Sequence, residues 1–453
     1  MNKDMTQGKP SSVLWRYSLP LLISVAFQQF YNMADSMIAG NFIENGENAL
    51  AAIGASYPIT MLFMAFAVGC NSGCSVIVSN LFGGKRFARL RTAVFTSLIS
   101  VGVLSVLLTL IGALFSADLL RLLGTPENVF GDARAYLDIY VYGVPFLLFY
   151  NVCNGVFAAL GDSKTPLYFL IGSSIANILL DFGAIVGLNM GVPGAAWATF
   201  AAQGAAAILA LFSLLRRIKR LDRGDDREEV RLFSSEMLGK IAMIAIPSIL
   251  QQSFVSVGNL FIQRIVNDYG SSAMAGYSTA IKLNTFVITS VSAMSNGMSA
   301  FTAQNAGAGK LDRIVKGFKT SLVMSAMIAL PITALYVGFR EPLIRAFMKN
   351  SEDAAAVMIG CGFLTIVAPF YFTVTAKLNC DAVLKGAGAV RCFVITTFTD
   401  LILRVVLAYL FSGPLGMGLD GVWWSWPVGW GVSAALSVGF YLFGNWKKKI
   451  HGI

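Results

Sequence analysis

The sequence predicts an all-α integral membrane protein with twelve transmembrane helices in two pseudo-symmetric six-helix lobes. Three observations lead to this prediction. Hydrophobic residues make up 56% of the 453 residues and charged residues only 13%, whereas soluble proteins carry about 25% charged residues. Long apolar segments recur along the whole chain, and the second half repeats features of the first. Together these observations indicate a polytopic helical membrane protein.

Twelve apolar segments are each long enough, at about 1.5 Å per residue, to cross a hydrocarbon core of about 30 Å. They are, in order, residues 13–39, 51–80, 92–115, 134–160, 166–188, 192–216, 237–266, 274–305, 317–339, 354–383, 391–411 and 420–446. The first of them follows a polar start and is too long for the apolar region of a signal peptide, so no cleavable signal is expected.

The basic residues gather in alternate loops. If both termini are cytoplasmic, 24 lysines and arginines fall on the cytoplasmic side and only five on the other side. The positive-inside rule therefore predicts two cytoplasmic termini and an even number of spans. The formal net charge of +10 is spread over these short loops. We therefore expect no nucleic-acid partner, because such binding needs a continuous basic surface.

The two halves of the chain repeat each other. Matching pairs are Pro20 and Pro247, Phe27 and Phe254, Asn32 and Asn259, Pro145 and Pro369, and Gly161 and Gly388. A charged stretch between the halves predicts an N-lobe at 1–215, a cytoplasmic linker at 216–236 and a C-lobe at 237–453. Parallel repeats of six helices are typical of transporters, with a substrate site between the halves and alternating access by rocking.

Several other function classes lack their usual sequence signals. The only histidine is His451, and the six cysteines lie inside predicted spans. Cys70 and Cys74 are one helical turn apart, which is not the spacing of a zinc or redox motif. The sequence has no nucleophile elbow, no glycine-rich phosphate loop and no filter repeat of a channel. We therefore predict neither an enzyme nor a cofactor.

Unpaired acids inside the first half are the main functional candidates. Asn177 and Asp181 lie one turn apart on one helical face, and no lysine or arginine is nearby in the sequence to pair with Asp181. Asp35 is about 9 Å from the outer end of its span, and Asp181 and Thr199 are at similar depth. An unpaired carboxylate inside a membrane must take a proton or bind a cation. The oxygens of Asp35, Asn177, Asp181 and Thr199 would suit Na⁺ as well as H⁺.

Embedded charges in the second half are different, because they have partners at helical spacing. Asp381 lies four residues after Lys377, and Asp400 lies four residues before Arg404. Lys282 adds a further positive charge. The sequence leaves open whether these five residues bind substrate or are structural.

Further polar residues share faces of predicted helices. Gln28, Tyr31 and Asp35 are three and four residues apart, and Asn151 and Asn154 are three apart. Such residues either line a substrate cavity or form interhelical hydrogen bonds, and spacing alone does not separate the two.

The chain resembles the multidrug and toxic compound extrusion (MATE) family over essentially its whole length. The resemblance rests on the order of several short motifs: YNMADSMIAG, LAAIGASYP, FAALGDSKTP, NILLD, GVPGAAWAT, AQNAGAGK and LKGAG. It implies a V-shaped fold and export of cationic, amphipathic compounds by H⁺ or Na⁺ antiport across the cell membrane. It also implies that a monomer in contact with membrane lipid can do this work.

The pattern is similar to the DinF-like and MepA-like bacterial branch. Matched position by position, that branch implies ion coupling at Asp35, Asn177, Asp181 and Thr199, and substrate contacts at Gln28, Tyr31, Asn151 and Asn154. The NorM-like branch has acids in the seventh and tenth spans, where this chain has Gln251, Gln252 and Val374. We therefore expect no second cation site in the C-lobe. Related folds also flip lipid-linked saccharides, and Lys282, Lys377 and Arg404 keep that alternative open.

Overall fold

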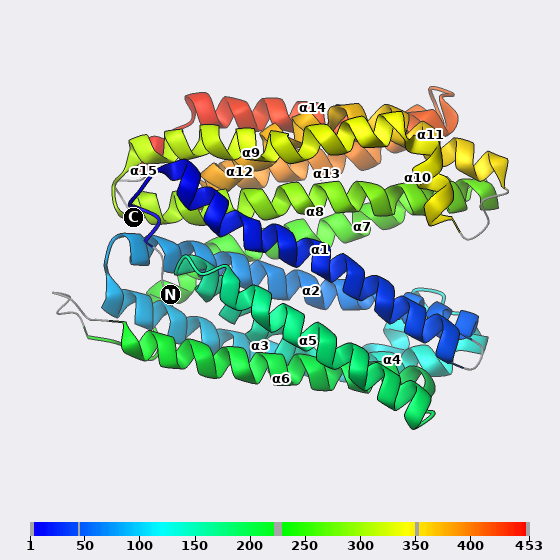
Figure 1. Cartoon of the computed structure of the whole chain (residues 1–453), viewed down its shortest axis with the longest axis horizontal. Coiled ribbons are helices and arrows are strands. Elements are labelled where there is room, and N and C mark those ends of the chain that lie inside the picture. The colour runs from blue at the N-terminus through cyan, green and yellow to red at the C-terminus, as the bar shows by residue number, and fades with distance from the viewer. Residues whose placement is uncertain (1–3, 44–45, 222–228, 349–352, 450–453) are drawn as a thin grey trace. The chain divides into compact units, whose positions relative to one another are not determined.

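The computed structural model describes residues 4–43, 46–221, 229–348 and 353–449, and this part of the chain is helical throughout (Figure 1). The helices are α1 Pro10–Phe42, α2 Gly46–Gly83, α3 Phe87–Leu122, α4 Glu127–Ala159, α5 Lys164–Phe182, α6 Gly191–Arg220, α7 Ser235–Asn267, α8 Ser271–Gly307, α9 Leu311–Gly338, α10 Arg340–Phe347, α11 Ala354–Val367, α12 Tyr371–Gly386, α13 Val390–Ser412, α14 Gly418–Phe443 and α15 Trp446–Lys449. A π-helical turn, Gly183–Gly187, extends α5, and a 3₁₀ turn, Ala368–Phe370, joins α11 to α12.

The all-helical prediction is confirmed, and the described residues contain ten segments long and apolar enough to cross a membrane. Helices α1 and α8 match the first and eighth predicted spans and have 33 and 37 residues, but they are not among the ten. Both carry polar residues along their length, such as Gln28 and Asp35 in α1 and Lys282 in α8. The number of twelve crossings therefore stays a prediction.

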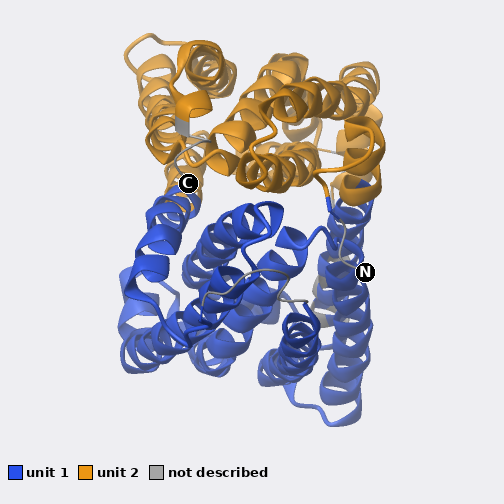
Figure 2. Ribbon diagram, turned by 90° about the vertical axis from the view of Figure 1, so that its left-hand side faces the viewer, with its two compact units in different colours: residues 1–4, 19–253 blue, residues 5–18, 254–453 orange. Residues whose placement is uncertain are grey.

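The chain divides into two compact units (Figure 2). Unit 1 contains residues 1–4 and 19–253, and unit 2 contains residues 5–18 and 254–453. Two helices are divided: the start of α1 belongs to unit 2, and most of α7 belongs to unit 1. The lobe boundaries predicted from the sequence, 1–215 and 237–453, stay a prediction. Residues 222–228 of the predicted linker lie outside the described residues.

The segment before α1 is bound tightly within unit 2. Arg313 of α9 donates to the backbone oxygens of Met5, Gln7 and Gly8 at 3.1, 3.1 and 2.7 Å. Met5 is fully buried, and its backbone nitrogen donates to Gln304 Oε1 at 2.9 Å. An arginine can satisfy several carbonyl oxygens at once because its guanidinium carries five N–H donors. These bonds explain why the start of α1 groups with the second half of the chain.

The segment before α7 has the reciprocal position, because it is held within unit 1. The backbone nitrogens of Arg231 and Ser234 donate to Thr92 Oγ1 and Thr96 Oγ1 of α3 at 3.0 and 3.1 Å. Each unit therefore binds the segment that precedes the first helix of the other half.

Matching turns show that the sequence repeat is also a structural repeat. Gly161 and Gly388 are 227 residues apart and have φ angles of +75° and +72°. Gly191 and Gly418, again 227 apart, both have φ of +59°. Residues with a Cβ rarely adopt this left-handed conformation, so the turns require glycine. Pro20 and Pro247 have the same spacing. This spacing therefore relates α5 and α6 to α13 and α14.

The cores of the two units have different compositions. In unit 1, α2, α3 and α4 pack through small and aliphatic residues such as Leu90, Leu137 and Val141. In unit 2, Trp423 stacks on Tyr277 at 5.4 Å and meets Phe363 edge-on at 5.2 Å. Such aromatic pairs add stability beyond the area they bury.

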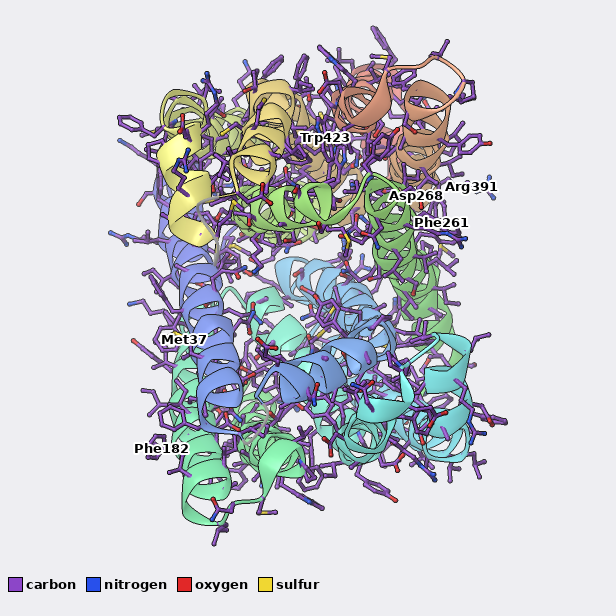
Figure 3. All side chains as sticks on the ribbon, turned by 90° about the vertical axis from the view of Figure 1, so that its right-hand side faces the viewer. Met37, Phe182, Phe261, Asp268, Arg391 and Trp423 are labelled. Carbon is purple, nitrogen blue, oxygen red and sulfur yellow. The ribbon has the colours of Figure 1, made fainter. Side chains whose placement is uncertain are left out.

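Apolar side chains also cover the outer faces of the helices. Trp423 is 1% exposed, while Met37, Phe182 and Phe261 are about half exposed (Figure 3). Large apolar side chains on the outside of long apolar helices are expected where lipid, rather than water, surrounds the protein.

Candidate functional site

The acidic cluster of unit 1 joins three helices. It consists of Tyr31 and Asp35 of α1, Asn177 and Asp181 of α5, and Thr199 of α6. Tyr31 Oη lies 2.8 Å from the side-chain amide of Asn177, and that amide lies 3.4 Å from Thr199 Oγ1. Asp181 is completely buried and Asn177 is 2% exposed. The structure thus brings together the four predicted ion-coupling residues and one predicted substrate residue, Tyr31.

The orientation of the Asn177 amide decides how this cluster is connected. In one orientation, Tyr31 Oη donates to Asn177 Oδ1 and the amide nitrogen faces Thr199. In the reversed orientation, the nitrogen donates to Tyr31 Oη at 2.8 Å and to Asp181 Oδ2 at 3.0 Å. We prefer the reversed orientation, because the Asp181 carboxylate accepts hydrogen bonds and needs a donor. Asn177 then bridges α1 and the buried acid of α5.

The carboxyl groups of Asp35 and Asp181 interact electrostatically with each other. Asp181 Oδ1 is buried and has no hydrogen-bond partner in the described part of the chain. Residues 17–84 and 165–215, which surround the two acids in sequence, contain no lysine or arginine. Two carboxylates in one poorly solvated site repel each other, and a proton or a cation between them removes the repulsion. The arrangement can therefore hold one positive charge.

Tyr136 of α4 is a member of the site that the sequence analysis missed. It interacts electrostatically with Tyr31, Asp35 and Asp181. It also stacks on Tyr140 with ring centroids 6.4 Å apart. The spacing of these two tyrosines, one helical turn apart, was the available signal. It did not point to the acids, because the contact crosses from α4 to α1 and α5.

The other predicted substrate residues are not part of this cluster. Gln28 is exposed on α1. Asn151 donates to Leu147 O of its own helix at 2.9 Å, and Asn154 Oδ1 is buried with no partner among the described residues. Their role in binding substrate stays a prediction.

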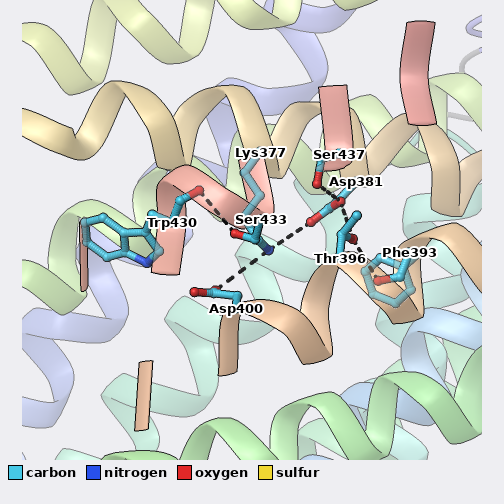
Figure 4. Close-up of polar contacts among 8 residues, drawn as sticks. All are labelled: Lys377, Asp381, Phe393, Thr396, Asp400, Trp430, Ser433 and Ser437. Atoms are coloured by element: carbon cyan, nitrogen blue, oxygen red, sulfur yellow. Dashed lines mark hydrogen bonds and ion pairs between the residues drawn. The ribbon is translucent and has the colours of Figure 1, made fainter. Parts of the chain in front are cut away.

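Unit 2 contains a buried charge cluster made of Lys377 and Asp381 of α12 and Asp400 and Arg404 of α13. Figure 4 shows Lys377, Asp381 and Asp400. Lys377 Nζ lies 2.9 Å from Asp381 Oδ2 and 3.9 Å from Asp400 Oδ2. Asp381 Oδ1 also accepts from Thr396 Oγ1 at 2.8 Å and from Ser437 Oγ at 2.7 Å. Asp381 is therefore neutralised and fully hydrogen-bonded, as a buried structural carboxylate must be.

Asp400 and Arg404 are less completely paired than Lys377 and Asp381. Asp400 Oδ1 and Arg404 Nε are buried and have no hydrogen-bond partner among the described residues. The guanidinium of Arg404 instead lies over the ring of Trp426 at 4.4 Å, a favourable cation–π contact. With two positive and two negative side chains, the cluster is formally neutral.

The structural repeat relates one part of each cluster. The spacing of 227 residues takes Asn177 to Arg404 and Thr199 to Trp426. Asn177 accepts a hydrogen bond from the Thr199 backbone nitrogen at 3.1 Å in the preferred amide orientation, and Arg404 contacts Trp426 through the cation–π interaction. The same spacing takes Asp181 to Ala408. At the position of Asn177, unit 2 therefore has a cationic side chain of its own.

The turn between α4 and α5 has a structural role. Asp162 accepts from the backbone nitrogens of Lys164 and Thr165, both at 3.1 Å, and it pairs with Arg217. Burial by itself raises the pKa of Asp162, but the bonds from Thr165 and Arg217 outweigh it and lower the pKa below the ordinary 3.8. Asp162 thus fixes the start of α5, which carries Asn177 and Asp181.

Metal-binding clusters are not found in the described residues, where no group of three or more histidine, cysteine or acidic side chains comes together.

Comparisons with known proteins agree with this architecture. The MatE family model matches residues 20–182 and 247–410. The chain is 29% identical over 454 residues to the probable multidrug resistance protein YoeA of Bacillus subtilis, covering 98% of this chain and 97% of that protein. It is 24% identical to the multidrug export protein MepA of Staphylococcus aureus, covering 91% and 89%.

Solved structures share the fold. A structure titled as the outward-facing conformation of a multidrug resistance MATE family transporter superposes with a TM-score of 0.88 at 24% identity, covering 100% of this chain and 98% of that one.

A relative from Shewanella oneidensis, named FAD transporter, is 26% identical and covers 90% of this chain and 89% of that protein. The family model covers most of the chain, in two matching stretches. The chain therefore belongs to the MatE (multidrug and toxic compound extrusion) family of multi-pass membrane transporters.

Proposed function

We propose that this protein is a secondary multidrug exporter that exchanges H⁺ or Na⁺ for cationic, amphipathic compounds by alternating access. In this proposal twelve helices cross the cell membrane in two six-helix lobes, at 1–215 and 237–453, and both termini are cytoplasmic. A monomer surrounded by lipid does the work without a cofactor. The names of YoeA and MepA support the multidrug substrate class.

The observation that carries the proposal is the pair of neighbouring carboxyl groups, Asp35 and Asp181, in a part of the chain without lysine or arginine. A cation entering between them neutralises their repulsion and changes the hydrogen bonds of Asn177. Because Asn177 joins α1, α5 and α6, this change alters the packing of all three helices. Ion binding can thus be coupled to a different arrangement of the bundle.

Coupling requires the ion and the substrate to have opposite effects on one conformational equilibrium. A cationic substrate that approaches Tyr31 and Asp35 competes directly with the ion for negative charge. We assign Gln28, Asn151 and Asn154 to the same substrate path, since their polar groups supply hydrogen bonds that a mainly apolar cavity lacks.

The test is efflux of ethidium from proteoliposomes under a pH gradient alone and under a Na⁺ gradient alone. We expect one gradient to drive export in the wild type and neither to drive it in Asp181→Asn. Export by both Asp35→Asn and Asp181→Asn at the wild-type rate would show that the acid pair does not couple transport.

A lipid-linked saccharide is the second candidate substrate, and the name of the relative called FAD transporter supports an anionic compound as an alternative. An anion would need free positive charge. Lys377 is neutralised by Asp381 and Asp400, so this alternative depends on Lys282 and Arg404. Absence of ethidium export under both gradients, with folded and correctly inserted protein, would favour it.

A further inference from the structure

A groove of about 570 Å³ lies in unit 2 between the start of α13 and the last turns of α14. Small and apolar residues form most of its wall: Ala389, Ala435, Leu436, Gly439, Phe440 and Phe443. A Cβ added at Gly439 would meet no atom within 4 Å, so the groove is open above this residue. Phe443 at its edge is 87% exposed. The groove is thus an apolar surface groove along the outside of a membrane-spanning helix pair.

The end of the groove is rigid. Trp446 of α15 is buried, and its Nε1 donates to Tyr441 O at 2.7 Å. Its ring stacks on Tyr441 at 5.5 Å, and Tyr441 in turn stacks on Phe318 of α9 at 4.2 Å. These contacts hold α15 across the end of the groove.

Positive charge surrounds this closed end. Arg391 lines the groove and is exposed, and Lys447 and Lys448 of α15 are exposed beside it. No acidic residue lines the groove in the described part of the chain. Asn445 adds a neutral hydrogen-bonding group. An apolar channel with cations at one end is complementary to an amphiphile that has an acyl chain and an anionic head.

We propose that this groove binds an anionic phospholipid. One acyl chain lies along Ala435 and Gly439, and the phosphate lies between Arg391 and the lysines of α15. Helices α13 and α14 are both long and apolar enough to cross a membrane, so their basic ends lie at the level of the lipid head groups. Basic pockets between transmembrane helices at this level bind acidic head groups. The site is separate from the acidic cluster, and its test does not depend on transport.

The test uses the native thiol of Cys392, which lines the groove and is half-buried. Cys361 of α11 is also half-buried but does not line the groove, so it is an internal control. The purified protein in detergent is labelled with N-ethylmaleimide, with dioleoyl phosphatidylglycerol or dioleoyl phosphatidylcholine added. Peptide mass spectrometry then gives the labelling rate of each cysteine.

We expect phosphatidylglycerol to slow labelling of Cys392 about fivefold at four times its dissociation constant, because only a fifth of the sites are then free. Labelling of Cys361 should not change, and phosphatidylcholine should protect neither cysteine. Arg391→Gln should remove the protection, whereas Arg391→Lys, which keeps the charge, should retain most of it. Arg345→Gln, at an exposed arginine paired with Glu341, should behave as the wild type.

Equal protection by phosphatidylcholine would overturn the proposal, since the groove would then hold any lipid. Equal protection by glycerol 3-phosphate would overturn it as well, since a soluble anion would be sufficient. Gly439→Leu fills the apolar part without changing charge. If this variant kept the full protection by phosphatidylglycerol, the acyl chain would not occupy the groove.

Discussion

The buried polar clusters of the two units share one related position of the internal repeat, that of Asn177 and Arg404, and they differ in charge. In unit 1, the carboxyl groups of Asp35 and Asp181 interact, and Asn177 connects Asp181 to Tyr31 of α1. In unit 2, the position of Asn177 holds Arg404 and the position of Asp181 holds Ala408. The two acids of the unit 2 cluster, Asp381 and Asp400, lie beside Lys377. The cluster of unit 1 is acidic and contains no basic side chain, and the cluster of unit 2 is formally neutral.

This difference separates a site that can exchange a charge from a site that stabilises the fold. A buried carboxylate with a fixed lysine partner gains nothing from an additional cation. A pair of carboxylates without such a partner is relieved by each proton or cation that enters. The two related halves of the chain therefore differ in whether their buried acids have a basic partner.

The largest effect is expected from removing an acid of unit 1. Asp181→Asn keeps the shape and the hydrogen bond to Asn177 but removes the charge that attracts a cation. Gradient-driven ethidium export should fall at least tenfold, which corresponds to about 1.4 kcal/mol of lost coupling. Asp118→Asn, at an exposed acid of α3, is the control. If both variants exported equally well, the acidic cluster would have no special role.

A large effect on stability, rather than on coupling, is expected in unit 2. Lys377→Met leaves Asp381 and Asp400 buried without their cation, which typically costs about 3–5 kcal/mol. Denaturant titration in detergent should show this loss. The double variant Lys377→Met with Asp381→Asn restores neutrality and should recover part of the stability. A single variant as stable as the wild type would contradict the structural assignment.

A smaller effect is expected from replacing Arg404. Arg404→Asn gives unit 2 the amide that unit 1 has at the related position and removes the contact with Trp426. A desolvated cation–π contact contributes about 2 kcal/mol, so stability should fall by this order. Gradient-driven export should persist in the folded fraction. Loss of export without loss of stability would show that Arg404 takes part in transport rather than in stabilising the fold.

The smallest effect concerns the turn that positions α5. The pKa of Asp162 lies below its ordinary value in the folded protein. Its contribution to stability is therefore complete above the unfolded pKa near 3.8 and is lost as the pH falls through the folded value. Asp162→Ala should cost about 0.5–2 kcal/mol, as for the loss of other helix caps.

Hydrogen exchange at the start of α5 would measure this contribution. The variant should exchange faster than the wild type at pH 7, and the difference should shrink at pH 3 and below. The related turn in unit 2 has Ala389 at this position and should show no such pH dependence. Exchange that changed equally in both turns would indicate global acid unfolding rather than titration of Asp162.

Much of the acidic cluster could be predicted from the sequence, because the signals for it lie within single predicted helices. A carboxylate in an apolar segment without nearby lysine or arginine is unusual, whatever the rotation of the helix about its axis. Asn177 and Asp181 are one turn apart, and depth along each span placed Asp35 and Thr199 at the same level. The contacts between these residues follow those predictions, and the amide of Asn177 is the connecting group.

Contacts between helices could not be predicted in the same way. Tyr136 of α4 interacts electrostatically with the acids, and Thr396 of α13 and Ser437 of α14 complete the hydrogen bonds of Asp381. Whether such residues meet depends on the rotation of each helix about its axis and on its depth. The spacing of residues along one helix fixes neither quantity.

The sequence by itself determined the apolar helices, the repeat of 227 residues and the contrast between unpaired and paired acids. These features follow from composition and from helical periodicity, which act within one segment. Only the tertiary structure decided that the segment before α1 belongs to unit 2, that Arg404 stacks on Trp426 and that a basic groove follows α13 and α14. Each of these depends on side chains that are distant in sequence and meet only when the helices pack.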